Sequence, residues 1–118
     1  MKIYDIINAK GILDEISQNK NIPTKSAYKI YIMLSKLTPS LEFFEKKRSE
    51  AFEKYGVKDG ENIIIPQEHQ AEFMSMMNEI GNFDCEGKIE KIDISLDINL
   101  GISPSDIALL SPFINFVE

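Results

Sequence analysis

The stretch LTPSLEFFEKKRSEAFEKYGVKDG (residues 37–60) has the character of the second half of a long charged helix followed by a turn. In this stretch and the segment before it, apolar residues and one arginine recur at alternating spacings of three and four: Ala27, Ile30, Leu34, Leu37, Leu41, Phe44, Arg48, Ala51 and Tyr55. This heptad spacing predicts a helix from Thr24 to Tyr55 with a narrow apolar seam. A continuous helix of that length would span about 48 Å.

Pro39 lies inside the predicted helix. A proline in a helix interior costs about 3 kcal/mol unless it occupies a first turn or a kink, and Thr38 before it is a suitable N-cap. The sequence therefore predicts either one long helix bent near Pro39 or two nearly collinear helices. Gly56 is expected to end the helix in the left-handed conformation.

The seam on this helix has to be covered by another helix. Residues 2 to about 18 form an amphipathic helix that reaches roughly half the length of the long one. The distal half, from Phe44 to Tyr55, needs a further cover, which is either a third helix of this chain or a second copy of the chain. We define the interaction seam as Leu34, Leu37, Leu41, Phe44, Arg48, Phe52 and Tyr55. Arg48 is the kind of polar exception that fixes register or partner choice.

The second half of the chain predicts short strands and two helices. VKDGEN is a turn, NIII a short strand, and the segment from Pro66 to Gly81 a third helix with an apolar side of Phe73, Met74, Met77 and Ile80. KIEKIDISLDINL (residues 88–100) alternates apolar with polar residues and predicts a strand with one buried face. Ser103 and Pro104 start a helix that runs to Leu110 and is broken by Pro112.

The fold class predicted is α+β in a single domain, 1–118. Residues 1–56 form a helical hairpin, and residues 57–118 form a strand–helix–strand–helix portion packed on it. NIII and KIDISLDI are expected to make a small antiparallel sheet. The core is expected to be closed by Ile107, Leu110, Phe113 and Phe116.

The charge is divided unevenly along the chain. Residues 1–60 carry eleven Lys or Arg against eight Asp or Glu, whereas residues 61–118 carry two against eleven. This split is compatible with packing of the acidic half on the basic helices, with head-to-tail association between copies, or with an ordinarily solvated surface. A further alternative is an acidic face at Glu90, Asp93 and Asp97 that is presented to a basic protein partner. The opening MKIYDIINAK has no uninterrupted apolar stretch, so neither a signal peptide nor a membrane span is expected there.

The residues that carry chemistry are few. His69 is the only histidine, and a helix would place it beside Glu72, but a zinc site generally needs three protein ligands. Cys85 is the only cysteine and has acidic neighbours, which disfavour a reactive thiolate. The glycines are dispersed, and the basic cluster EKKRSE is flanked by acids. We therefore expect no catalytic residues, metal or cofactor, and no direct binding of nucleic acid.

Three motifs carry a family likeness. IPTKSAYKI, FEKKRSEAFEKYG and ISPSDIALLSPFI resemble small proteins encoded by bacteriophages and prophages of Gram-positive bacteria, over roughly residues 22–118. The resemblance supplies no catalytic residues, and Pro39 departs from its pattern. It implies a protein of the host cell cytoplasm.

Two functions remain open. The first is a non-enzymatic phage-encoded protein-interaction module, either a virion-assembly accessory or an adaptor. It would use the interaction seam and the exposed edge of the NIII or the ISLDI strand to bind a virion or host protein or a second copy. The second is an acidic inhibitor of a host or anti-phage defence protein, which would use the acidic face.

Overall fold

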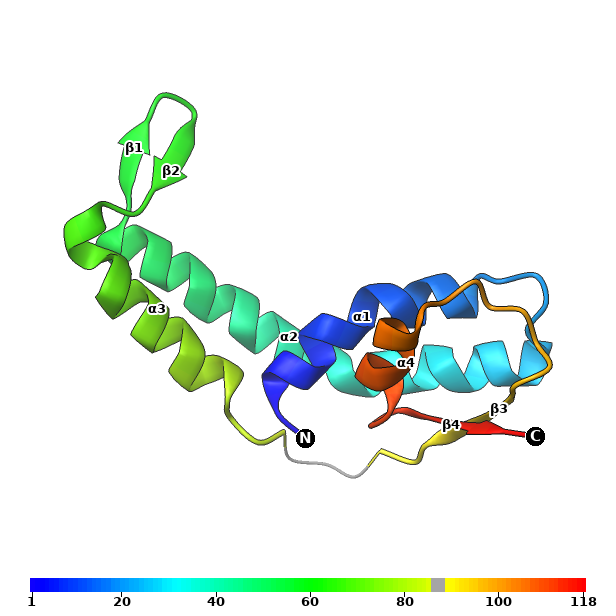
Figure 1. Cartoon of the computed structure of the whole chain (residues 1–118). Coiled ribbons are helices and arrows are strands. Elements are labelled where there is room, and N and C mark those ends of the chain that lie inside the picture. Colours follow the sequence, from blue (N-terminus) through cyan, green and yellow to red (C-terminus); the bar gives the residue numbers. More distant parts are fainter. Residues whose placement is uncertain (86–88) are drawn as a thin grey trace.

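The computed structural model describes residues 1–85 and 89–118, and it confirms the α+β class. A long central helix, a third helix, a small antiparallel sheet and a short C-terminal helix are all present (Figure 1). The elements in chain order are α1 (Ile3–Ser17), α2 (Thr24–Tyr55), β1 (Val57–Asp59), β2 (Asn62–Ile64), α3 (Gln67–Gly81), β3 (Ile92–Ser95), α4 (Pro104–Leu110) and β4 (Ile114–Val117).

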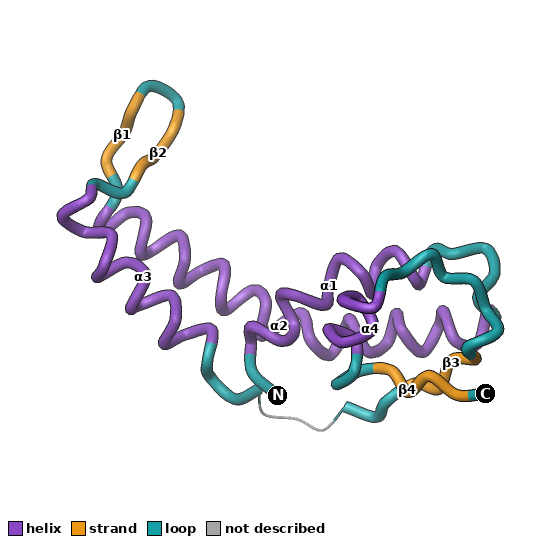
Figure 2. Tube along the Cα trace, in the orientation of Figure 1, coloured by secondary structure: helices purple, strands orange, loops and turns teal. Residues whose placement is uncertain are grey.

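The molecule is elongated, with principal extents of 51 × 30 × 22 Å. Its radius of gyration is 17.2 Å, against about 13.5 Å expected for a compact chain of this length. Figure 2 shows the cause: the second half of α2, the β1–β2 hairpin and α3 extend away from the remaining elements. We call residues 42–81 the distal arm and the rest of the described chain the core lobe.

The core lobe holds the main hydrophobic core. Its buried side chains come from α1, the first half of α2, β3, α4 and β4. The largest fully buried side chains are Phe113, Ile6, Leu13, Ile16, Ile30, Ile94 and Leu110. Leu110 and Phe113 close the core as expected, but the prediction for Ile107 is wrong, since its side chain is 40% exposed. The seven-residue helix α4 directs only one side toward the core, and Leu110 occupies it.

The helix α2 is continuous from Thr24 to Tyr55 and contains Pro39. Its two halves run in different directions, with the change near the middle of the helix, where Pro39 falls in the sequence (Figure 1). Proline removes one main-chain hydrogen bond and its ring displaces the preceding turn, which bends a helix. Of the two alternatives, one long bent helix is therefore the correct one.

Replacing Pro39 by alanine should stabilise the protein by roughly 1–3 kcal/mol, because alanine restores the missing hydrogen bond and removes the ring clash. Urea unfolding followed by circular dichroism measures the change. Pro104→Ala is the matched control, since Pro104 stands at the start of α4, where proline is favoured and no gain is expected. A loss of stability in Pro39→Ala would show that the bend is needed to pack both halves of α2.

The end of α2 differs from the prediction. Gly56 has φ −83° and ψ 153°, an extended conformation and not the left-handed one. The reason is that the chain passes directly from the helix into β1, which begins at Val57. VKDGEN is therefore more than a turn, because its first three residues form a strand.

The strand pairing also differs. β1 and β2 form the antiparallel sheet, whereas β3 pairs in parallel with β4, with Ile92 opposite Ile114. The predicted pairing of NIII with KIDISLDI is thus wrong. NII finds its partner across a two-residue turn, and α4 supplies the crossover that a parallel pair requires. The strand is also shorter than predicted: Leu96 is exposed beyond its end, and Lys88 lies outside the described residues.

The helix α3 is attached to α1 at its C-terminal end. The Tyr4 hydroxyl donates to the main-chain oxygen of Met77 (3.2 Å) and to Oδ1 of Asn78 (2.9 Å). The Ile3 amide donates to the Phe83 oxygen at 3.1 Å. The distal arm is thereby fixed to the core lobe at its base, while its tip has no such attachment in the described residues.

Candidate protein-interaction surface

The interaction seam is divided between the core lobe and the distal arm. Leu37 is buried, and Leu34 and Leu41 pack partly buried against the core cluster. Farther along, the Phe44 ring lies 6.1 Å from that of Tyr4. The first half of the interaction seam therefore contributes to the core rather than to a free surface.

The second half of the interaction seam is covered by α3. The Phe52 and Phe73 rings are 5.0 Å apart, and the Tyr55 and His69 rings 5.8 Å apart, centroid to centroid. Ala51 is fully buried, which lets the two helices approach closely. The third helix of the chain is thus the cover of the distal half, as one of the two predicted alternatives had it.

Arg48 lies on the outside of this helix pair. Its guanidinium carbon is 5.4 Å from the centroid of the Phe52 ring, and Nη1 is 3.5 Å from Oε2 of Glu45. Half of the side chain is exposed. Arg48 therefore shields one face of Phe52 from water and presents its charge at the surface.

The distal arm has a thin interior. Its buried residues are Ala51, Met77, Ile80 and Gly81, and Phe52 and Phe73 are only half-buried. Met74, predicted on the apolar side of α3, is 55% exposed. Segments with few buried apolar contacts open at low free energy. The distal arm thus combines low local stability with apolar side chains that no other described residue covers.

The tip of the distal arm is the β1–β2 hairpin, and every residue in both strands is exposed. Three of them are β-branched aliphatic residues: Val57 is 49% exposed, Ile63 51% and Ile64 46%. Gly60 has φ 66° at the first of two loop residues, the position that a type II′ turn reserves for glycine. The turn thus sets the register of a hairpin that has no packed face.

The acidic face is solvated. Glu90, Asp93 and Asp97 are all exposed, and none forms an ion pair with a described residue. Asp93 accepts a hydrogen bond from the Asn115 side chain at 3.2 Å. The three carboxylates lie before, within and after β3. These residues make this segment a negatively charged part of the core lobe. In Figure 1, β3 and the β1–β2 hairpin lie at opposite ends of the molecule.

The one histidine has carboxylates on both sides. Nε2 of His69 is 3.9 Å from Oε1 of Glu68, and Nδ1 is 3.8 Å from Oε2 of Glu72. Within residues 1–85 and 89–118, no group of three His, Cys, Asp or Glu side chains is placed to hold a metal ion. Cys85 is half-buried, and its amide donates to the Met1 oxygen at 2.8 Å.

The fold and surface define an elongated α+β protein with a projecting helical arm and an exposed hairpin at its tip. No protein-family model, curated protein or solved structure matches this chain. None of the helices in the described part of the chain has the length and apolar character needed to cross a membrane.

Sequence reasoning identified part of this surface. The turn before NIII and the proline after it predict a short strand, and NIII is one of the two strands, with ISLDI, whose edge is expected to be exposed. The first strand was missed, since VKD has a single apolar residue. Its signal is Gly60 at the first of two positions between Val57-Lys58-Asp59 and NIII, which is typical of a hairpin with a type II′ turn.

Proposed function

We propose that this chain is a non-enzymatic, phage-encoded protein-interaction module of the host cytoplasm, serving as a virion-assembly accessory or an adaptor. The contact surface in this proposal is the distal arm, with the hairpin as its centre. The observation that carries it is the exposure of Val57, Ile63 and Ile64 on a two-stranded sheet. Such a hairpin is marginal alone and gains stability when a partner covers it.

The hairpin geometry indicates how a partner would bind. Asp59 and Asn62 flank the two-residue turn and form its hydrogen-bonded pair, so the next pair, Lys58 and Ile63, directs its main-chain groups outward. A strand of a partner can pair with either outward edge while an apolar pocket takes the Ile63 or Ile64 side chain. Because the hairpin lies at the far end of the distal arm, the core lobe does not obstruct it (Figure 1).

Ile64→Lys should abolish capture of the partner without unfolding the protein, because it places a charge in the apolar contact and removes no buried side chain. The measurement is affinity capture of tagged protein from infected or prophage-induced cells, washed at low and high salt, with mass spectrometry of the bound proteins. We expect virion components or one host protein at both salt levels, and their loss in Ile64→Lys.

Ile107→Lys is the matched control, since it makes the same substitution at a comparably exposed isoleucine of the core lobe. It should capture the same proteins as the parent chain. Equal capture by Ile64→Lys and the parent would contradict the proposal. A dimeric mass by light scattering that becomes monomeric in Ile64→Lys would identify a second copy as the partner.

The acidic inhibitor is the second candidate, and the exposure of Glu90, Asp93 and Asp97 favours it. Attraction between a carboxylate cluster and a basic groove weakens as salt screens it. A basic host protein recovered only at low salt, and recovered equally by Ile64→Lys, would support this function in place of the first.

A further inference from the structure

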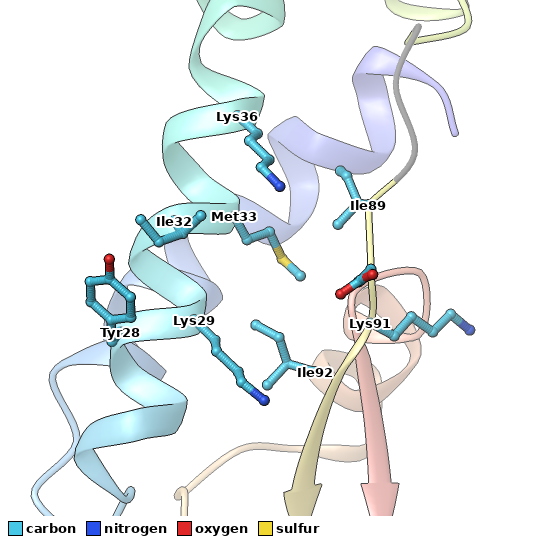
Figure 3. Close-up of a pocket in the computed structure, with 9 residues that line it drawn as sticks. Tyr28, Lys29, Ile32, Met33, Lys36, Ile89, Lys91 and Ile92 are labelled. Carbon is cyan, nitrogen blue, oxygen red and sulfur yellow. The ribbon is translucent and has the colours of Figure 1, made fainter.

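A small cavity of about 250 Å³ lies in the core lobe between α2 and the segment that leads into β3. One wall is formed by five residues of α2 from Tyr28 to Lys36, and the other by residues 89–92. Its inner part is apolar: Met33 and Ile92 are buried, and Ile32 and Ile89 are half-buried. In Figure 3 the side chains of Met33 and Ile92 point toward each other across the space between the two elements.

Two lysines of α2 lie at the opening of this cavity. Lys29 and Lys36 are exposed, and Figure 3 shows both side chains directed from α2 toward the opposite segment, whereas Lys91 points away. Lys29 and Lys36 are seven residues apart, which is about 10 Å along the helix axis. Neither forms an ion pair with a described residue. Among the described lining residues, Glu90 is the one acidic residue, against the two lysines that point toward the opposite segment.

We propose that this cavity binds a small amphipathic anion, with its aliphatic part against Met33 and Ile92 and its carboxylate at Lys29 or Lys36. The charge argument is local: the chain as a whole has a net charge of −6, yet the lysines exceed the acids at this opening. Apolar cavities with a few charged groups at the mouth bind ligands of this chemistry, the apolar part providing burial and the cations fixing orientation.

The volume limits the size of the ligand. For comparison, an apolar protein cavity of about 150 Å³ binds benzene, which has six non-hydrogen atoms. A ligand of eight to ten non-hydrogen atoms therefore fits, and an eight-carbon carboxylate is a suitable probe. The inference does not depend on the proposed function, because the cavity and the hairpin lie in different lobes.

The test is titration of the full-length ¹⁵N-labelled protein with sodium octanoate, followed by two-dimensional NMR. We expect saturable shifts of the amides of residues 28–36 and 89–92. Lys29→Gln or Lys36→Gln should weaken binding about tenfold, the amount expected for the loss of one charge-assisted hydrogen bond. Lys46→Gln is the control, since Lys46 is an exposed lysine of the same helix outside the cavity, and it should bind as the parent does.

Octanol distinguishes the contribution of the apolar cavity from that of the lysines, because octanol has an eight-carbon chain without the negative charge. It should bind at least tenfold more weakly than octanoate. Equal binding of octanol and octanoate would overturn the role of the lysines. Shifts spread over the surface, or no saturation up to millimolar octanoate, would overturn the site itself. Well-dispersed spectra of each lysine variant show that it is folded.

Discussion

Phe113→Ala should destabilise the protein by about 3–5 kcal/mol, the range observed when a buried phenylalanine is truncated. Phe113 has no exposed surface, and it connects α4 to β4. Its amide donates to the Leu110 oxygen at 2.8 Å, and its own oxygen accepts from the Ile92 amide at 3.0 Å. Because the Phe113 side chain is fully buried in the core cluster, its truncation leaves a cavity in the core lobe.

Urea unfolding of the parent and the variant gives the difference in free energy. Phe43→Ala is the matched control, because Phe43 is 40% exposed and its removal leaves no cavity in the core. We expect the control to lose less than about 1 kcal/mol. Similar losses in the two variants would contradict the position of Phe113 at the centre of the core. A lower slope with denaturant in Phe113→Ala would indicate that the distal arm and the core lobe unfold separately.

The sequence predicted helices better than strand partners, for a local reason. Ser103 and Asp106 cap α4 reciprocally: the Asp106 amide donates to Oγ of Ser103 at 3.2 Å, and the Ser103 amide donates to Oδ2 of Asp106 at 3.1 Å. Such capping signals depend on residues only three positions apart, so they can be recognised in the sequence without knowledge of the tertiary structure. β4 has no comparable signal, because INFV becomes a strand only where α4 places it beside β3.

The candidate surfaces divide in the same way. Heptad spacing identified which face of α2 is apolar, but spacing alone could not distinguish α3 from a second copy as its cover. The cavity was not predicted, because it requires residues 28–36 and 89–92 to face each other. The sequence shows the i, i+7 spacing of Lys29 and Lys36, but two lysines on one helix face are usually only solvated. Only the structure shows that an apolar segment lies opposite them.

The attachment of the distal arm predicts that a glycine-to-alanine substitution stabilises the protein at one helix position and destabilises it at another. A Cβ atom added at Gly81 would overlap the ring of Tyr4, whereas a Cβ at Gly11 meets nothing within 4 Å. Both glycines lie in helices. Gly11→Ala should therefore stabilise the protein by about 0.5–1 kcal/mol through helix propensity.

Gly81→Ala should have the opposite effect, a loss of about 1–3 kcal/mol from overpacking. Tyr4 cannot move away freely, because its hydroxyl bonds Met77 and Asn78 and its ring lies against Phe44. Moving it breaks the contacts that fix α3 to α1, so amide hydrogen exchange in α3 should accelerate more than exchange in α4.

Thermal unfolding combined with hydrogen exchange measures both effects, and a double-mutant cycle identifies the cause. In a Tyr4→Ala background the added methyl group at Gly81 has no ring to displace, so the penalty should largely disappear. A penalty that persists there would place the strain in the helix backbone. Equal stabilisation by Gly11→Ala and Gly81→Ala would mean that Tyr4 does not pack over the end of α3. The distal arm would then join the core lobe only through α2 and the chain that follows α3, and its tip would sweep a wider range of positions.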